Sequence, residues 1–101
     1  MKMYILIKDS VPVGFAALAS AHASLAAYLK FQHDPDTQHW VSGVFRKTIC
    51  KVSDREFEQA KAFDDHVVIT ESGLGGSEIA IAFKPRVEWP KAFRFYRLYS
   101  D

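Results

Sequence analysis

The stretch from Met3 to Phe31 constrains the fold most, because it joins a short apolar run to a long alanine-rich segment. The run Tyr4–Ile7 is apolar at every position, as expected of a strand buried on both faces of a sheet. A polar turn ends in Gly14, and the alanine-rich segment after it has high helix propensity and no internal Gly or Pro. Strand, turn and helix in this order begin an α/β domain, in which ligands bind beyond the carboxyl ends of the strands.

The expected helix has two different faces. A smooth face, which would let the helix lie close to a sheet, consists of Ala16, Ala19, Ala23 and Ala27. An apolar stripe at spacings of four, three and four consists of Leu18, His22, Leu25 and Leu29. We expect this stripe to face the core, with His22 buried and hydrogen-bonded to a backbone group. The alternative is a catalytic histidine that points into a cleft with Glu71.

Composition sets the size and class of the protein. A chain of 101 residues is expected to form one domain, residues 1–101, and its 49% hydrophobic and 25% charged residues are ordinary for a soluble globular protein. The formal net charge of +1 excludes the strongly basic footprint of most nucleic-acid binders. A local basic patch stays open, since the charge distribution decides a contact.

The cysteine content and the N-terminus indicate the compartment. Cys50 is the one cysteine and lies in a β-branched run, which favours a buried small hydrophobe over a nucleophile. Without a cysteine framework, a reducing compartment is expected. Lys8 and Asp9 interrupt the N-terminal apolar run too early for a secretory signal, and no window is apolar for the length of a membrane span. We therefore expect a cytoplasmic protein with no membrane partner.

The middle of the chain predicts a loop, a strand and a second helix. Residues 33–39 are polar with a central proline and predict a loop that continues to Gly43; their spacing of His and Asp matches no standard zinc or calcium site. Residues 44–52 predict the second strand. Ser53 and Glu56 form a capping-box pattern, which predicts a helix from Asp54 to about Phe63.

Two further strands are expected at 66–70 and 78–83, joined by the glycine-rich turn 71–77. So short a connection makes them antiparallel neighbours, whereas the earlier crossovers favour parallel pairing. The turn lacks the lysine and the following helix of a phosphate-binding loop, which favours a flexible hairpin. The predicted fold is an α/β three-layer sandwich, with a mixed four-stranded sheet, an antiparallel last strand and helices on both faces.

The tail Trp89–Tyr99 mixes aromatic side chains with lysine and arginine. A helix that starts near Pro90, with the proline as its first residue, is favoured over a short strand. Aromatic and basic residues together can bind RNA by stacking and charge. In a domain of this size they more often cap the core, so both roles stay open.

The first helix also carries a resemblance to a known family. The segment VPVGFAALASAHASLAAYL resembles the first helix of the type II peptidyl-tRNA hydrolases, whose signature is approximately G-K-x-A-A-Q-x-[SA]-H-A. The positions that agree are Gly14, Ala17, Ala21, His22 and Ala23. The signature lysine is replaced by Phe15 and the glutamine by Ala19. The resemblance implies hydrolysis of the ester between a peptide and its tRNA, without a metal or other cofactor.

The resemblance covers about residues 2–85 and includes the loop after the third strand, which in the family is approximately R-D-A-G-R-T-Q. Here Glu71 replaces the aspartate and Gly73 is retained, while Leu74 and Gly75 stand at the arginine and threonine positions. Ser77 could supply a hydroxyl if the loop is rearranged.

The resemblance assigns the candidate site residues. Candidate catalytic residues are Glu71, Ser77 and Lys8, the last of which matches a basic position of the family. Candidate substrate-binding residues are Gly14, Phe15, Ser72 and Gly73. We expect Lys8, Phe15 and Glu71 to line one depression with Ser72 or Ser77 at its rim. Candidate partners are tRNA and, in a homodimer, a second copy of the chain.

Two functions follow from these replacements. The first is a peptidyl-tRNA hydrolase with weak turnover, because the signature lysine and threonine are missing. The second is a catalytically inactive relative that binds RNA or a protein partner.

Overall fold

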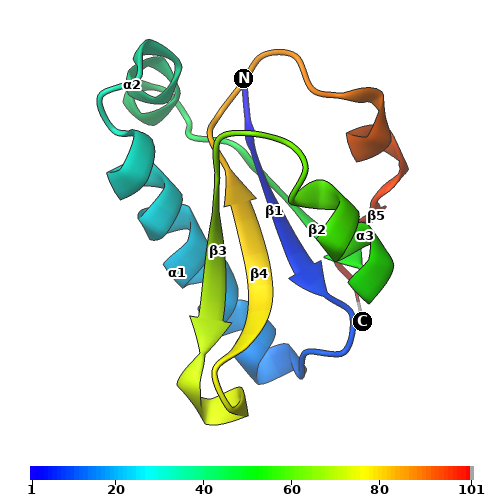
Figure 1. The fold of residues 1–101 in the computed structure, drawn as a ribbon. Helices are drawn as coiled ribbons and strands as arrows, with labels where there is room; N and C mark the ends of the chain where they lie inside the picture. Colours follow the sequence, from blue (N-terminus) through cyan, green and yellow to red (C-terminus); the bar gives the residue numbers. More distant parts are fainter. Residues whose placement is uncertain (101) are drawn as a thin grey trace.

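The structure, a computed structural model, describes residues 1–100 and has an α/β fold. Five strands form one mixed open sheet in the order β3-β4-β1-β2-β5 (Figure 1). Their bounds are β1 Met3–Lys8, β2 Lys47–Val52, β3 His66–Glu71, β4 Ser77–Phe83 and β5 Arg97–Leu98. β1 is interior and pairs parallel with β2, while β4 is antiparallel to both β1 and β3. The pairings expected for the first, third and fourth strands are therefore confirmed.

The described residues form three α-helices, α1 Val13–Phe31, α2 Pro35–Ser42 and α3 Asp54–Ala60, of which α1 and α3 cover the sheet. Side chains alternate along β1, so Met3, Ile5 and Ile7 meet α1, whereas Tyr4 and Leu6 lie in the cluster of α3. α1 and α3 accordingly lie over opposite faces of the sheet (Figure 1).

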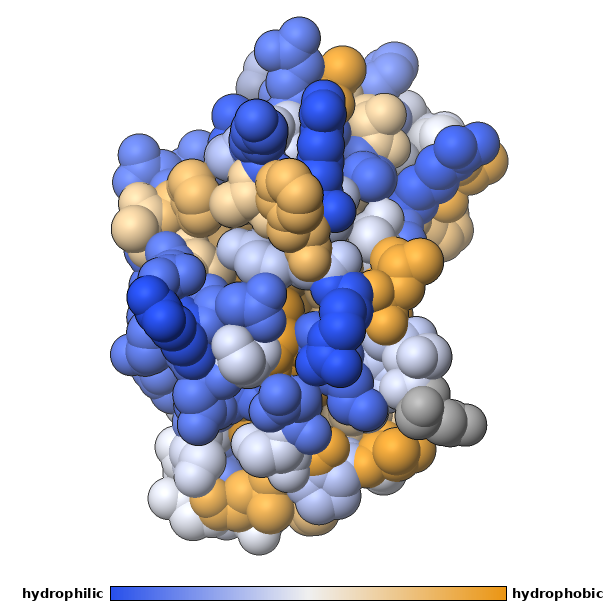
Figure 2. Space-filling model, turned by 90° about the vertical axis from the view of Figure 1, so that its right-hand side faces the viewer, coloured by the Kyte–Doolittle hydropathy of each residue, from blue (hydrophilic) through white to orange (hydrophobic). Residues whose placement is uncertain are grey.

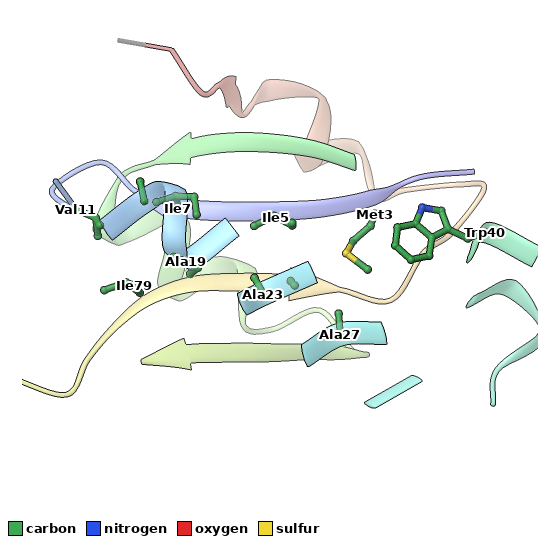
Figure 3. Close-up of a cluster of buried hydrophobic side chains, with 12 residues drawn as sticks. Met3, Ile5, Ile7, Val11, Ala19, Ala23, Ala27, Trp40 and Ile79 are labelled. Carbon is green, nitrogen blue, oxygen red and sulfur yellow. The ribbon is translucent and has the colours of Figure 1, made fainter. Parts of the chain in front are cut away.

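The alanine face of α1 is the buried one. Ala19, Ala23 and Ala27 point at the side chains of β1, and Trp40 of α2 closes the end of the cluster (Figure 3). Because alanine is small, the helix backbone can come close to the sheet, and the isoleucines of the strands fill the space between the two layers.

The leucine stripe of α1 is on the surface, which corrects our expectation. His22 is exposed, as are Leu18, Leu25 and Leu29. The alanine and leucine faces lie well apart around the helix, so burying one leaves the other toward solvent. The expected core histidine at position 22 is wrong.

α2 replaces the loop expected over residues 33–43. The side chain of Asp34 caps the helix by accepting the Asp36 N–H at 2.9 Å, and Pro35 takes the first helical position. This is the usual arrangement of a helix start, and the sequence Asp-Pro could have predicted it. Trp40 is buried and its Nε1–H donates to the Arg46 carbonyl at 2.8 Å.

The capping box of α3 is confirmed. Ser53 Oγ accepts the Glu56 N–H at 3.1 Å, and Glu56 Oε1 accepts the Ser53 N–H at 2.9 Å. The helix ends at Ala60, before the expected Phe63. β2 starts later than expected, at Lys47, and Phe45 before it has a φ of 40°, which lies outside the extended region.

The C-terminal tail forms a 3₁₀ helix, Lys91–Phe95, and then β5, where one longer helix was expected. Pro90 is the N-cap residue that precedes this short helix and not, as had been expected, its first residue. β5 pairs antiparallel with Cys50 and Lys51 of β2, which adds the fifth strand. Phe93 of the tail is buried among Tyr4, Phe83 and Trp89, so the tail covers the α3 face of the core.

Candidate functional site

The carboxyl ends of three strands meet at one end of the molecule. β1 ends at Lys8, β2 at Val52 and β3 at Glu71, and all three run in the same direction. The first residues of α1 and the turn between β3 and β4 lie at this end as well (Figure 1). This is where α/β sheets place their ligands.

The β1–α1 loop and the β3–β4 turn converge on a cavity of about 450 Å³. The β1–α1 loop, the β3–β4 turn and the start of α3 all contribute to its wall. Its lining residues are Lys8, Ser10, Val11, Pro12, Asp54, Leu74, Ser77, Glu78 and Ile79. Two of the predicted catalytic residues, Lys8 and Ser77, therefore share one cavity.

Lys8 lies at the end of β1 and over an aromatic ring. Its Nζ is 4.6 Å from the ring centroid of Phe57, a buried residue of α3, which is a cation–π contact. Among the described residues that line the cavity, Lys8 is the one cation, opposed by the carboxylates of Asp54 and Glu78. The cavity is therefore not a strongly positive site.

Glu78 is held by an ion pair behind the cavity wall. Its Oε1 contacts Lys61 Nζ at 2.5 Å, and the same ammonium contacts Glu58 Oε2 at 2.8 Å. The hydrogen bonds that Lys61 donates to Glu58 and Glu78 raise the pKa of Lys61 above its usual value. Lys61 thus partly neutralises the acidic side of the cavity.

Glu71, Phe15 and Gly73 meet beside the cavity and do not line it. Glu71 Oε1 accepts the Gly73 N–H at 3.0 Å, so its carboxylate caps the short turn Ser72–Leu74. A Cβ at Gly73 would lie 3.1 Å from Phe15 Cε1 and 3.2 Å from Glu71 Oε1, so a larger residue here requires these side chains to shift by a few tenths of an ångström. The expected single depression with Lys8, Phe15 and Glu71 is therefore not observed. Lys8 lines the cavity, whereas Phe15 and Glu71 lie next to Gly73 beside it.

The other predicted residues lie around these two groups. Ser77 Oγ donates to the Leu74 carbonyl at 2.7 Å. Ser72 and Gly14 are exposed, and Phe15 is half-buried against the α1 core. His22 lies halfway along α1, in a hollow that Leu25, Leu29 and Val68 also line. Glu71 does not line this hollow.

Sequence reasoning missed the two carboxylates of the cavity. Asp54 follows the capping serine of α3, and Glu78 is the second residue of β4. Both lie at the end of the sheet where β1, β2 and β3 terminate, so this position could have marked them as candidate site residues.

A larger hollow of about 540 Å³ lies between α1, α2 and β2. Its aromatic wall includes Trp40 and Phe45, and Lys47 Nζ lies 5.3 Å and 4.8 Å from the two ring centroids. Among the described residues, its titratable side chains are Lys47 and Tyr28, and no carboxylate, histidine or thiol lines it.

Two further findings concern nucleophiles and membranes. Cys50 is buried, and desolvation raises the pKa of its thiol to about 11, as expected of a structural cysteine. None of the helices in residues 1–100 combines the length and the apolar character that crossing a membrane requires.

Comparisons with known proteins add no family to these observations. No family model matches the chain, and no curated protein matches it.

Proposed function

We propose that this chain is a divergent type II peptidyl-tRNA hydrolase, acting in the cytoplasm, that cleaves the ester between a peptide and its tRNA with weak turnover. The observation that carries the proposal is the shared cavity of Lys8 and Ser77, built from the two loops that the resemblance marks. The finer description of the fold as that family's three-layer sandwich belongs to the same proposal.

Each group in or beside the cavity has a role in this proposal. The Lys8 ammonium attracts a phosphate of the acceptor end or stabilises the oxyanion that forms as water attacks the ester. The Ser77 hydroxyl orients the attacking water, since its proton is donated to the Leu74 carbonyl and its lone pairs stay available. A carboxylate takes the proton from water: Glu71 by the family position, or Asp54 by its place in the cavity wall.

Weak turnover follows from the charge of the cavity. One lysine faces two carboxylates, and Phe15 stands where the family has a second cation. Each phosphate contact that is lost makes the slope of the logarithm of the tRNA binding constant against the logarithm of salt concentration less steep by about one unit.

The test is hydrolysis of peptidyl-tRNA by the purified protein, by Lys8→Ala and by Phe15→Lys. We expect slow hydrolysis by the unaltered protein, loss of it in Lys8→Ala, and a rate at least severalfold higher in Phe15→Lys. Val13→Lys is the matched control, because it adds the same charge to an exposed position of the same helix turn. A gain in the control equal to that in Phe15→Lys would contradict a local role for position 15.

Restoring the family threonine at position 75 is not part of this test. Gly75 has a φ of 69°, a left-handed conformation that costs a side chain with a branched Cβ about 1–2 kcal/mol. The turn would have to change its course before Gly75→Thr could help.

A second candidate function is an inactive relative that binds RNA or a protein partner. The observation that favours it is the Glu71 carboxylate, which is engaged with the Gly73 N–H and lies outside the cavity of Lys8. Salt-dependent tRNA binding without hydrolysis, in the unaltered protein and in Phe15→Lys, would select this function over the first.

A further inference from the structure

The hollow of about 540 Å³ between α1, α2 and β2 exists because α1 covers only part of the sheet. The helix packs on β1, β3 and β4 and leaves β2 with little cover on the same face. This face of β2 carries Lys47, Ile49 and Lys51, since Cys50 and Val52 point into the cluster on the α3 face. A strip of the sheet is therefore open beside the helix.

The hollow has the size and the apolar walls of a small-ligand site. Such sites usually enclose about 300–1,000 Å³. On the α1 side, the small residues Ser20, Ala21 and Ser24 leave the space, and Tyr28 lines the same side. Around α3 and the C-terminal segment, in contrast, hydrophilic side chains dominate the surface and hydrophobic ones form separate patches (Figure 2).

Phe45, in the wall of the hollow, has an unusual backbone conformation. Its φ is 40°, and its side chain is 50% exposed. A bulky residue rarely adopts a positive φ, and such conformations concentrate at ligand-binding sites. Glycine would adopt this backbone without strain and would expose no aromatic ring. Stability alone therefore does not account for a phenylalanine at this position.

The aromatic wall is fixed in the ligand-free protein. Trp40 is buried, and the hydrogen bond from its Nε1–H to the Arg46 carbonyl is 2.8 Å long. The rings of Trp40 and Phe45 meet edge to face, with their centroids 6.2 Å apart. A flat ligand can bind to a wall that is already ordered at a small cost in conformational entropy.

Lys47 gives the hollow its charge. Its Nζ lies 4.8 Å from the ring centroid of Phe45 and donates to the Phe45 carbonyl at 3.2 Å, which leaves two of its N–H groups for a ligand. None of the ion pairs among residues 1–100 includes Lys47. A cation without a carboxylate partner, next to an exposed aromatic ring, is complementary to an anion with a flat apolar body.

We propose that this hollow binds a small aromatic carboxylate, with its ring against Phe45 and its carboxylate at Lys47 Nζ. Aromatic rings attract one another beyond the area they bury, and the ammonium donates a charge-assisted hydrogen bond to the carboxylate. An aliphatic acid forms the same ion pair and lacks the ring contact. The hollow shares no lining residue with the cavity of Lys8, so this site is separate from the proposed hydrolytic site.

The test is a titration of isotope-labelled protein with cinnamate, followed by NMR of the two tryptophan indole N–H groups. Trp40 lines the hollow, whereas Trp89 packs in the cluster on the α3 face. We expect a saturable shift of the Trp40 signal, with a dissociation constant below about 1 mM, and no shift of the Trp89 signal. The spectrum of Trp89→Phe assigns the two signals.

Two comparisons test the chemistry of the ligand. Cinnamamide, which has nearly the same shape and no charge, should bind about fivefold more weakly than cinnamate. Octanoate, which keeps the charge and lacks the ring, should also bind about fivefold more weakly. Lys47→Met should weaken cinnamate binding about fivefold and leave cinnamamide binding unchanged, since methionine keeps an apolar side chain against the rings. Lys91→Met is the matched control, because Lys91 is an exposed lysine of the tail, and it should change neither affinity.

Phe45→Gly separates binding from folding. It should weaken cinnamate binding at least about tenfold, because the ring contact is lost. Its midpoint of urea unfolding should stay within about 0.5 M of that of the unaltered protein, since glycine adopts the positive φ without strain. Phe95→Gly is the matched control, because Phe95 is 72% exposed on the tail, and it should leave the affinity unchanged.

Several results would overturn the proposal. They are a Trp40 signal that cinnamate does not shift, an equal shift of the Trp89 signal, and equal affinities for cinnamate and either comparison ligand. Unchanged cinnamate binding by Phe45→Gly would overturn it as well.

Discussion

Replacing Phe93 by alanine should greatly destabilise the protein. Phe93 is 2% exposed, and its ring centroid lies 5.0 Å from those of Tyr4 and Trp89 and 5.1 Å from that of Phe83. Truncating a buried phenylalanine costs about 3–5 kcal/mol, through lost transfer free energy and the cavity that remains. That is a large part of the free energy of unfolding of a small domain, about 5–15 kcal/mol.

Urea unfolding, followed by far-UV circular dichroism, measures this cost. With a dependence on denaturant of about 2 kcal/mol per molar urea, a loss of 4 kcal/mol lowers the midpoint by about 2 M. Phe95→Ala is the matched control, since the same side chain two residues later is 72% exposed and should change the free energy of unfolding by less than about 0.5 kcal/mol.

The comparison also decides what the aromatic and basic tail does for the fold. Equal, small effects of Phe93→Ala and Phe95→Ala would refute the conclusion that the tail caps the core. They would instead favour a tail whose aromatic side chains are available to stack on bases.

Two further predictions concern helix ends. Ser53→Ala removes the side chain that accepts the Glu56 N–H and should cost about 1 kcal/mol in urea unfolding, whereas an unchanged midpoint would show that the capping box is energetically unimportant. Asp34 has a pKa below its usual 3.8, first because of its hydrogen bond with Lys84, so its charge stabilises the fold above that pH and this contribution is lost as the pH falls through the lowered pKa. Asp34→Asn keeps a capping side chain for α2, so below about pH 4 the unaltered protein should lose stability more steeply than the variant, and parallel pH profiles would contradict this.

Local patterns in the chain were sufficient for most of the elements. The apolar run of β1, the capping box at Ser53 and the glycine-rich turn before β4 each act through neighbouring residues, and each predicted its element correctly. Parallel pairing of β1 with β2 followed from the helix expected in the crossover between them. The helix α2 was also encoded locally, in Asp34 and Pro35, and was overlooked.

Two features of the fold depended on the tertiary structure. Two faces of α1 were apolar, and only the close approach of the helix to the sheet selected the alanine face, which left His22 and the leucines outside. β5 exists because the open side of β2 accepts two residues of the tail, a pairing between segments far apart in the sequence.

The composition of the site was decided in the same way. The sequence placed Lys8 and the β3–β4 turn at the correct end of the sheet, because strand direction determines where strands end. It could not show that Asp54 and Glu78 join Lys8 while Glu71 turns aside to cap its own turn. Which side chains share a cavity depends on packing and on competing hydrogen bonds, and neither is expressed in the spacing of residues along the chain.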